Sequence, residues 1–128
     1  MEVKIDTKQK FHVITLLQPE LSATMTEELS NRLSSLLHSD IKNVVLNLKE
    51  LQSIDTISAE NLVKVQQKFY ENSASFVICE LRPQVEEYLD KDQLLEMMNI
   101  TPTESEAWDI IQMEEIEREL LDGQGPEF

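Results

Sequence analysis

Three polar side chains stand together where an apolar run gives way to a helical pattern. Asp55, Thr56 and Ser58 follow the segment 44–48, which is apolar almost throughout. A hydroxyl group at a turn between a strand and a helix is placed where a partner protein can reach it. Local capping is the plain alternative, because Asp, Thr and Ser before a helix often accept hydrogen bonds from its first amide groups.

Catalysis by these hydroxyl groups is disfavoured, because no histidine or lysine lies close by in the sequence to act as a base. His12 and His38 fall on different elements, and the single cysteine, Cys79, is far from both. No residues have the spacing of a metal site, and no glycine-rich loop could cradle a phosphate. We therefore expect no enzymatic activity, no catalytic residues, no metal and no cofactor.

The elements around the polar side chains are predicted from apolar runs that are bounded by turn residues. Strands are expected at residues 3–7, 11–17, 44–48 and 75–80, and a short edge strand is expected near Ile100. The two later runs are nearly continuous and fit central strands that are covered on both faces. Pro19 should end the second strand, and residues 20–23 are predicted to form a loop.

The first two helices are predicted from capping signals and apolar spacing. Thr24 and Glu27 have the spacing of a capping box, and the apolar pattern that follows runs to about His38. Ser58 is predicted to cap the next helix, which carries apolar residues at helical spacing.

Two more helices are predicted in the last third of the chain. Pro83 suits the first turn of a short helix that runs to Leu89, and 93–98 adds further helical turns. Thr103 with Glu106 forms another capping box. The helix after it should carry four apolar residues: Trp108, Ile111, Ile116 and Leu120. It should end at Gly123, and residues 124–128 should be loose.

Strands that alternate with helices predict an α/β fold with a mixed, largely parallel sheet of four to five strands packed with helices. The length of 128 residues suits one domain with a modest core. We expect that domain to span residues 1–112. Residues 113–128 are expected to form an acidic, helical C-terminal extension with a loose tail.

The charge of the chain limits its partners. The formal net charge is −14, and residues 80–128 hold 15 acidic side chains against 3 basic ones. Nucleic acid and anionic membrane surfaces are improbable partners for such a chain. No apolar run could insert into a bilayer and no signal-peptide pattern is present, so a cytoplasmic protein is expected. The acidic part is either a solvated face or a docking surface for a basic protein.

Residues 41–56, with the sequence Ile-Lys-Asn-Val-Val-Leu-Asn-Leu-Lys-Glu-Leu-Gln-Ser-Ile-Asp-Thr, resemble the core of STAS domains, and of bacterial anti-sigma-factor antagonists in particular. In that family a strand ends in Leu-Asp-Leu or Leu-Asn-Leu. A hydrophobic residue follows, then Asp-Ser or Asp-Thr, and then a helix. The resemblance extends more loosely over residues 1–112.

The resemblance implies a STAS-like fold and a regulatory protein–protein interaction. In the family, a partner serine kinase that is also the anti-sigma factor phosphorylates the hydroxyl group after the Asp. The phosphoacceptor then maps to Thr56. The partner-binding segment maps to Asp55, Thr56, Ile57, Ser58, Ala59 and Glu60. This segment lacks both glycines of the common family pattern Asp-Ser-Ser-Gly-Leu-Gly.

The resemblance also supports an alternative from a different class. Some STAS domains use a similar loop to bind the ATPase of an ABC system for lipid transport, without any phosphorylation cycle. The altered loop 57–59 is compatible with that role. A kinase or sigma factor encoded beside the gene would favour the first function, and an ABC ATPase with its permease would favour the second.

Overall fold

A five-stranded sheet forms the centre of the molecule in a computed structural model that describes residues 1–124. The strands follow the order β1-β2-β4-β6-β7 across the sheet. Their bounds are Val3–Thr7 (β1), Phe11–Leu16 (β2), Asn43–Asn47 (β4), Phe76–Cys79 (β6) and Ile100–Thr101 (β7). Only β1 is antiparallel to its neighbour, so the predicted mixed, largely parallel sheet is confirmed.

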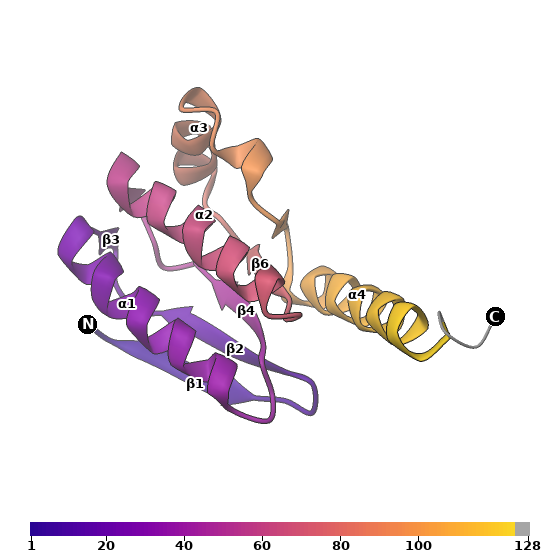
Figure 1. The fold of residues 1–128 in the computed structure, drawn as a ribbon. Helices are drawn as coiled ribbons and strands as arrows, with labels where there is room; N and C mark the ends of the chain where they lie inside the picture. Colours follow the sequence, from indigo (N-terminus) through magenta and orange to yellow (C-terminus); the bar gives the residue numbers. More distant parts are fainter. Residues whose placement is uncertain (125–128) are drawn as a thin grey trace.

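Helices cover both faces of this sheet (Figure 1). Their bounds are Ala23–Ser35 (α1), Thr56–Glu71 (α2), Pro83–Lys91 (α3) and Glu104–Gln124 (α4), with the short 3-10 turns Leu36–His38 (η1) and Leu95–Met97 (η2). α1 and α2 lie side by side over one face, α4 crosses the other, and α3 follows β6 beyond the end of the sheet.

The core has two sides because successive side chains of a strand point to opposite faces. Val44 and Leu46 pack with α1 and α2, whereas Val45, between them in the sequence, packs with α4. The core is apolar on both faces of the sheet at these positions, which explains the nearly continuous apolar run that predicted a central strand. The sheet is therefore held between two helical layers.

A second, two-stranded sheet was not predicted. β3 (Glu20–Leu21) pairs in parallel with β5 (Ser53–Ile54), so the loop predicted at 20–23 is wrong at its first two residues. Strands of two residues are too short to show a period in the sequence. Their place is fixed by long-range pairing. The amide groups of Gln52 and Ser53 also donate hydrogen bonds to the carbonyl oxygen of Pro19, at 2.7 and 3.0 Å.

Two predicted helix ends differ from the structure. The cap at Thr24 is wrong, because α1 begins at Ala23 after Ser22, whose carbonyl oxygen accepts a bond from the Thr26 hydroxyl group at 2.8 Å. The stop at Gly123 is also wrong, since α4 continues to Gln124. Glycine is only a weak helix breaker when its φ stays negative. The predicted loose tail falls mostly on 125–128, outside the described residues.

The start of α4 agrees with its prediction. The amide group of Glu106 donates to the Thr103 hydroxyl oxygen at 3.2 Å, which is the bond expected of a capping box. Ile111 is buried, but Ile116 and Leu120 are 56 % and 48 % exposed. The helix runs without a break across the predicted domain boundary at residue 112, and that boundary stays a prediction.

Candidate functional site

Asp55 caps α2 and fixes its first turn. Its Oδ1 accepts a hydrogen bond of 2.7 Å from the amide group of Ser58. Hydrogen bonding from Ser58 holds the pKa of the Asp55 carboxyl group below its usual value, so the side chain is ionised at neutral pH. The prediction that Ser58 caps this helix is therefore wrong. The plain alternative of local capping is confirmed for Asp55.

The small β3–β5 sheet places Asp55 from the other side. The amide group of Asp55 donates to the carbonyl oxygen of Leu21 at 3.4 Å, directly after the paired residue Ile54. The strand and the helix thus meet at one residue whose backbone and side chain are both bonded. This arrangement presents Thr56, the first residue of α2, in a defined position.

The hydroxyl group of Thr56 is bonded to the C-terminal end of α3. It donates to Asp92 Oδ2 at 2.9 Å and lies 2.7 Å from the hydroxyl oxygen of Tyr88. A threonine hydroxyl group has one proton, so Tyr88 donates to Thr56. The Asp92 carboxylate can accept the proton of Thr56, and it would repel a phosphate group placed on that oxygen.

The other residues of the predicted partner-binding segment divide into two sets. Ile57 is 58 % exposed and Glu60 is also exposed, whereas Ser58 and Ala59 are buried against the core. In this conformation a partner can reach Asp55, Ile57 and Glu60, and it can reach the half-buried Thr56 from one side. The structure thus brings the acid, the hydroxyl group and an exposed apolar side chain to one surface.

Tyr88 and Asp92 were missed by sequence reasoning. They lie 32 and 36 residues after Thr56, and only the tertiary fold brings them to it. The one signal in the sequence is their spacing of four, which places both on the same side of a helical segment. That spacing is common on surface helices and does not by itself point to a site.

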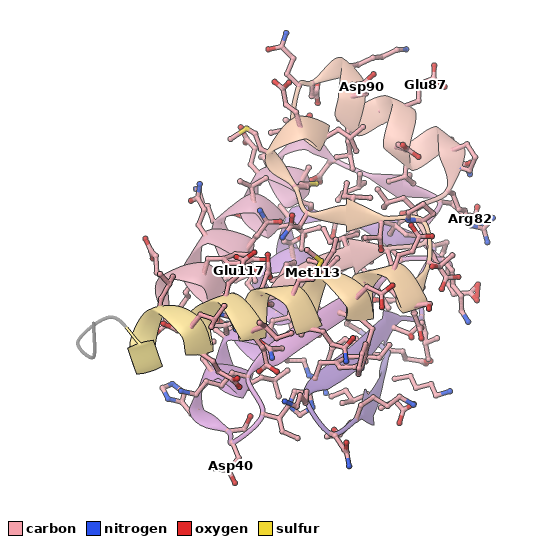
Figure 2. The ribbon with its side chains drawn as sticks, turned by 90° about the vertical axis from the view of Figure 1, so that its right-hand side faces the viewer. Asp40, Arg82, Glu87, Asp90, Met113 and Glu117 are labelled. Atoms are coloured by element: carbon pink, nitrogen blue, oxygen red, sulfur yellow. The ribbon has the colours of Figure 1, made fainter. Side chains whose placement is uncertain are left out.

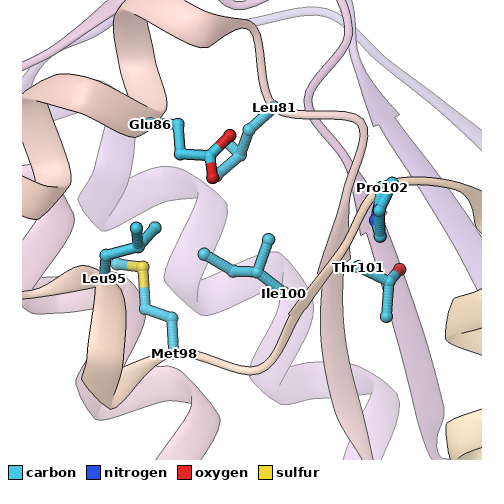
Figure 3. A pocket seen from close by; sticks show the side chains of 7 residues that line it. All are labelled: Leu81, Glu86, Leu95, Met98, Ile100, Thr101 and Pro102. Atoms are coloured by element: carbon cyan, nitrogen blue, oxygen red, sulfur yellow. The ribbon is translucent and has the colours of Figure 1, made fainter.

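A pocket of about 500 Å³ lies beside α3 (Figure 3). Five of the seven lining residues are apolar, and one carboxylate faces the pocket: Leu81, Glu86, Leu95, Met98, Ile100, Thr101 and Pro102. Residues two apart on a helix are about 200° apart, so Glu86 and Tyr88 lie on opposite sides of α3. The pocket is therefore separate from the Thr56 site. Its lining holds no histidine, lysine or cysteine that could pair with Glu86 in acid–base chemistry.

His12 and Cys79 have side chains of types that bind metals, but each has its own separate structural environment. His12 is buried, and its ring bonds the hydroxyl group of Thr7 and the carbonyl oxygen of Ile41, each at 2.9 Å. Burial raises the pKa of the Cys79 thiol to about 12, and Glu80 adds to the shift. Within residues 1–124, no three potential metal-binding side chains cluster together.

None of the helices described in residues 1–124 is long and apolar enough to cross a membrane.

The comparisons with known proteins agree with this architecture. The family model described as "STAS domain" matches residues 3–107. An anti-sigma-factor antagonist (STAS) domain protein from Planctomyces limnophilus is 18 % identical, with a TM-score of 0.72 over 86 % of this chain and 97 % of that one. The phosphorylated form of the Bacillus cell fate determinant SpoIIAA is 16 % identical, with a TM-score of 0.62 over 86 % and 99 %.

A murine anion transporter of the Solute Carrier 26 family contains a region of the same fold. It is 14 % identical, with a TM-score of 0.66, and the match covers 80 % of this chain and 18 % of the transporter. No curated protein matches the sequence. At these identities the solved structures show the fold alone, and the assignment of the chain to a family rests on the family model.

Proposed function

The chain belongs to the STAS domain family, and from that premise we propose that it is a regulatory protein–protein interaction domain that acts as an anti-sigma-factor antagonist, with Thr56 as its phosphoacceptor. The partner in this proposal is a serine kinase of the anti-sigma-factor type. The site itself performs no catalysis, and its surface is formed by Asp55, Thr56, Ile57 and Glu60.

The observation that carries the proposal is the hydroxyl group of Thr56 at the first residue of α2. It stands directly after Asp55, the ionised N-cap residue of α2, and it is half exposed. The bond to Asp92 at 2.9 Å leaves the oxygen oriented but does not bury it. A kinase can reach such an oxygen once Tyr88 and Asp92 release it.

Phosphorylation would change the charge of this surface sharply. A phosphothreonine adds about −1.5 to −2 charges at neutral pH. Asp92 and the nearby Glu60 are acidic, so the added charge meets repulsion on the surface that the partner contacts. In this proposal the partner binds the unmodified form, and the cost of desolvating the added charge at the contact surface favours release after phosphorylation.

The test is phosphorylation of the full chain by an anti-sigma-factor-type serine kinase with ATP. Peptide mass spectrometry should locate one phosphate at Thr56, and Thr56→Ala should abolish it. Thr24→Ala is the matched control, since Thr24 is an exposed threonine in the first turn of α1 and should leave the modification unchanged. Phosphate at another residue would refute the assignment of Thr56.

The second candidate is a subunit that binds the ATPase of an ABC system for lipid transport. It is favoured by the exposed Ile57 in the segment and by the intrachain bonds that already occupy the Thr56 hydroxyl group. Affinity capture with wild type, Thr56→Ala and Thr56→Glu separates the two functions. An antagonist should lose its kinase partner with Thr56→Glu, whereas an ABC ATPase should be captured equally by all three.

A further inference from the structure

The second half of α4 has an inverted polarity. Three polar side chains face the domain: Glu114, Glu115 and Arg118. Glu114 accepts a bond of 2.8 Å from the Tyr70 hydroxyl group, and Glu115 accepts one of 3.0 Å from the Asn43 amide group. Arg118 bonds the hydroxyl group of Ser75. This side of the helix is therefore held in place by polar contacts instead of apolar packing.

The opposite side of the same turns is apolar and exposed. Met113, Ile116 and Leu120 are 62 %, 56 % and 48 % exposed, and we call them the outer stripe. Their spacing of three and four residues places them in one line along the helix. Figure 2 looks onto α4 with Met113 labelled on this side. The outer stripe cannot turn inward without breaking the polar contacts of the other side.

A hollow of about 250 Å³ adjoins the outer stripe, between α4 and the turn that joins β1 to β2. Ile116 and Trp108 give it apolar walls. The rest of its lining is polar, and Lys10 Nζ lies 3.6 Å from Glu115 Oε1 there: Gln9, Lys10, Gln112, Glu115 and Glu119. Its size suits a single large apolar side chain. The stripe and the hollow thus offer a ridge with an adjoining cavity, which is a common form of a site for a partner helix.

Acidic side chains surround this apolar surface. Asp109, Glu117 and Glu119 are exposed on the same helix. A second copy of the chain would bring the same acidic flanks against these, at a net charge of −14 per copy. A basic partner meets no such repulsion from the flanks, and its lysine or arginine side chains would pair with them. Lys10, the cation that lines the hollow, is already paired with Glu115. The charges therefore select a basic occupant over a second copy.

We propose that the outer stripe and its hollow bind a basic amphipathic helix of a partner protein. The apolar side of that helix would cover Met113, Ile116 and Leu120, and its basic side chains would face the acidic flanks. The contacts of Glu114, Glu115 and Arg118 keep the surface preformed, which lowers the entropic cost of binding. The site is distinct from Thr56, since α2 alone extends for about 22 Å between its first residue and its last.

The single tryptophan of the chain, Trp108, lines the hollow and reports on its occupation. The probe is a synthetic peptide of leucine and lysine at helical spacing, without tryptophan, added to the full chain at physiological salt. Saturable change in Trp108 fluorescence is expected. The double variant Met113→Ser/Leu120→Ser should bind the peptide at least about tenfold more weakly, as expected for truncated anchor residues.

Two controls keep the outcome specific. Ile5→Ser removes an equally exposed apolar side chain on β1 and should leave the affinity unchanged. A peptide of serine and lysine with the same charge should bind far more weakly. Equal binding of the two peptides, or unchanged binding by the double variant, would overturn the proposal. Self-association of the wild type that the double variant abolishes would also overturn it, because the occupant would then be a second copy.

Discussion

At the scale of single residues, Asp55 and Thr56 have separate tasks although they are neighbours. The Asp55 carboxylate is bonded within its own helix turn, and the Thr56 hydroxyl group is bonded to α3. The family pattern of an acid followed by a hydroxyl residue therefore combines a structural cap with a group that a partner could modify. A substitution at Asp55 should change the stability of the helix start and leave the chemistry of Thr56 intact.

Asp55→Ala should lower the free energy of unfolding by about 1 kcal/mol, because the amide group of Ser58 loses its acceptor. Asp55→Asn should retain most of the stability, since asparagine is an equally good cap. Urea denaturation of the three proteins measures the difference. Equal losses in the two variants would show that the charge of Asp55, and not its cap, stabilises the fold.

The pH dependence of the same residue has a defined sign. The pKa of Asp55 in the folded chain lies below the ordinary value of 3.8, so its contribution is fully present above that value. It is lost as the pH falls through the lower, folded pKa. Between pH 5 and pH 2 the wild type should thus lose more stability than Asp55→Asn, whose cap carries no titrating group.

At the scale of elements, α3 is the part that Thr56 influences most directly. Only Val85 and Leu89 of this nine-residue helix are buried, so the bonds from Tyr88 and Asp92 to Thr56 are a large share of its attachment. Thr56→Glu places a carboxylate against Asp92. Hydrogen exchange of the α3 amide groups should become at least several times faster than in the wild type.

Two matched variants test this expectation. Thr24→Glu adds the same charge at an exposed position in α1 and should leave α3 exchange unchanged. Asp92→Asn combined with Thr56→Glu removes the repulsion and should restore part of the protection. Unchanged exchange with Thr56→Glu alone would show that α3 does not respond to charge at Thr56.

The sequence predicted the main elements because their signals are local. β4 and β6 are apolar on both faces, and Thr103 with Glu106 marks the start of α4, so each was found within one or two residues. The β3–β5 pair was missed because its strands are held by residues more than thirty positions apart. Capping by Asp55 was only an alternative to capping by Ser58, because Asp, Thr and Ser in one short segment have similar propensities to cap a helix.

The same limit applies to the candidate site. The sequence identified the segment 55–60, but it did not separate the exposed Ile57 from the buried Ser58 and Ala59. That separation depends on where the helix starts, and a shift of three residues in the cap rotates each side chain by most of a turn. The partners of Thr56 on α3 depend on the tertiary fold, and their spacing of four in the sequence is too common on surface helices to identify them.

At the scale of the whole molecule, the acidic last third of the chain is divided between two uses. Glu114 and Glu115 attach α4 to α2 and β4, while the exposed acidic residues flank the outer stripe. The attachment centres on Tyr70, whose hydroxyl group bonds Glu114 at 2.8 Å and accepts a bond from Asn99. One residue of α2 thus joins the C-terminal helix to the segment before β7.

Tyr70→Phe should lower the free energy of unfolding by about 1–2 kcal/mol, because a hydrogen bond to a charged group is lost within a half-buried site. Tyr88→Phe, which changes an exposed tyrosine in the same way, should cost less.

Burial, and then Glu114, raises the pKa of Tyr70 above the ordinary value of 10.0, so the folded chain holds this proton more tightly than the unfolded chain. The resulting stability is present below pH 10 and is lost as the pH rises beyond it. Wild type should therefore lose stability faster than Tyr70→Phe above pH 10, and parallel pH profiles would show that α4 is held without this bond.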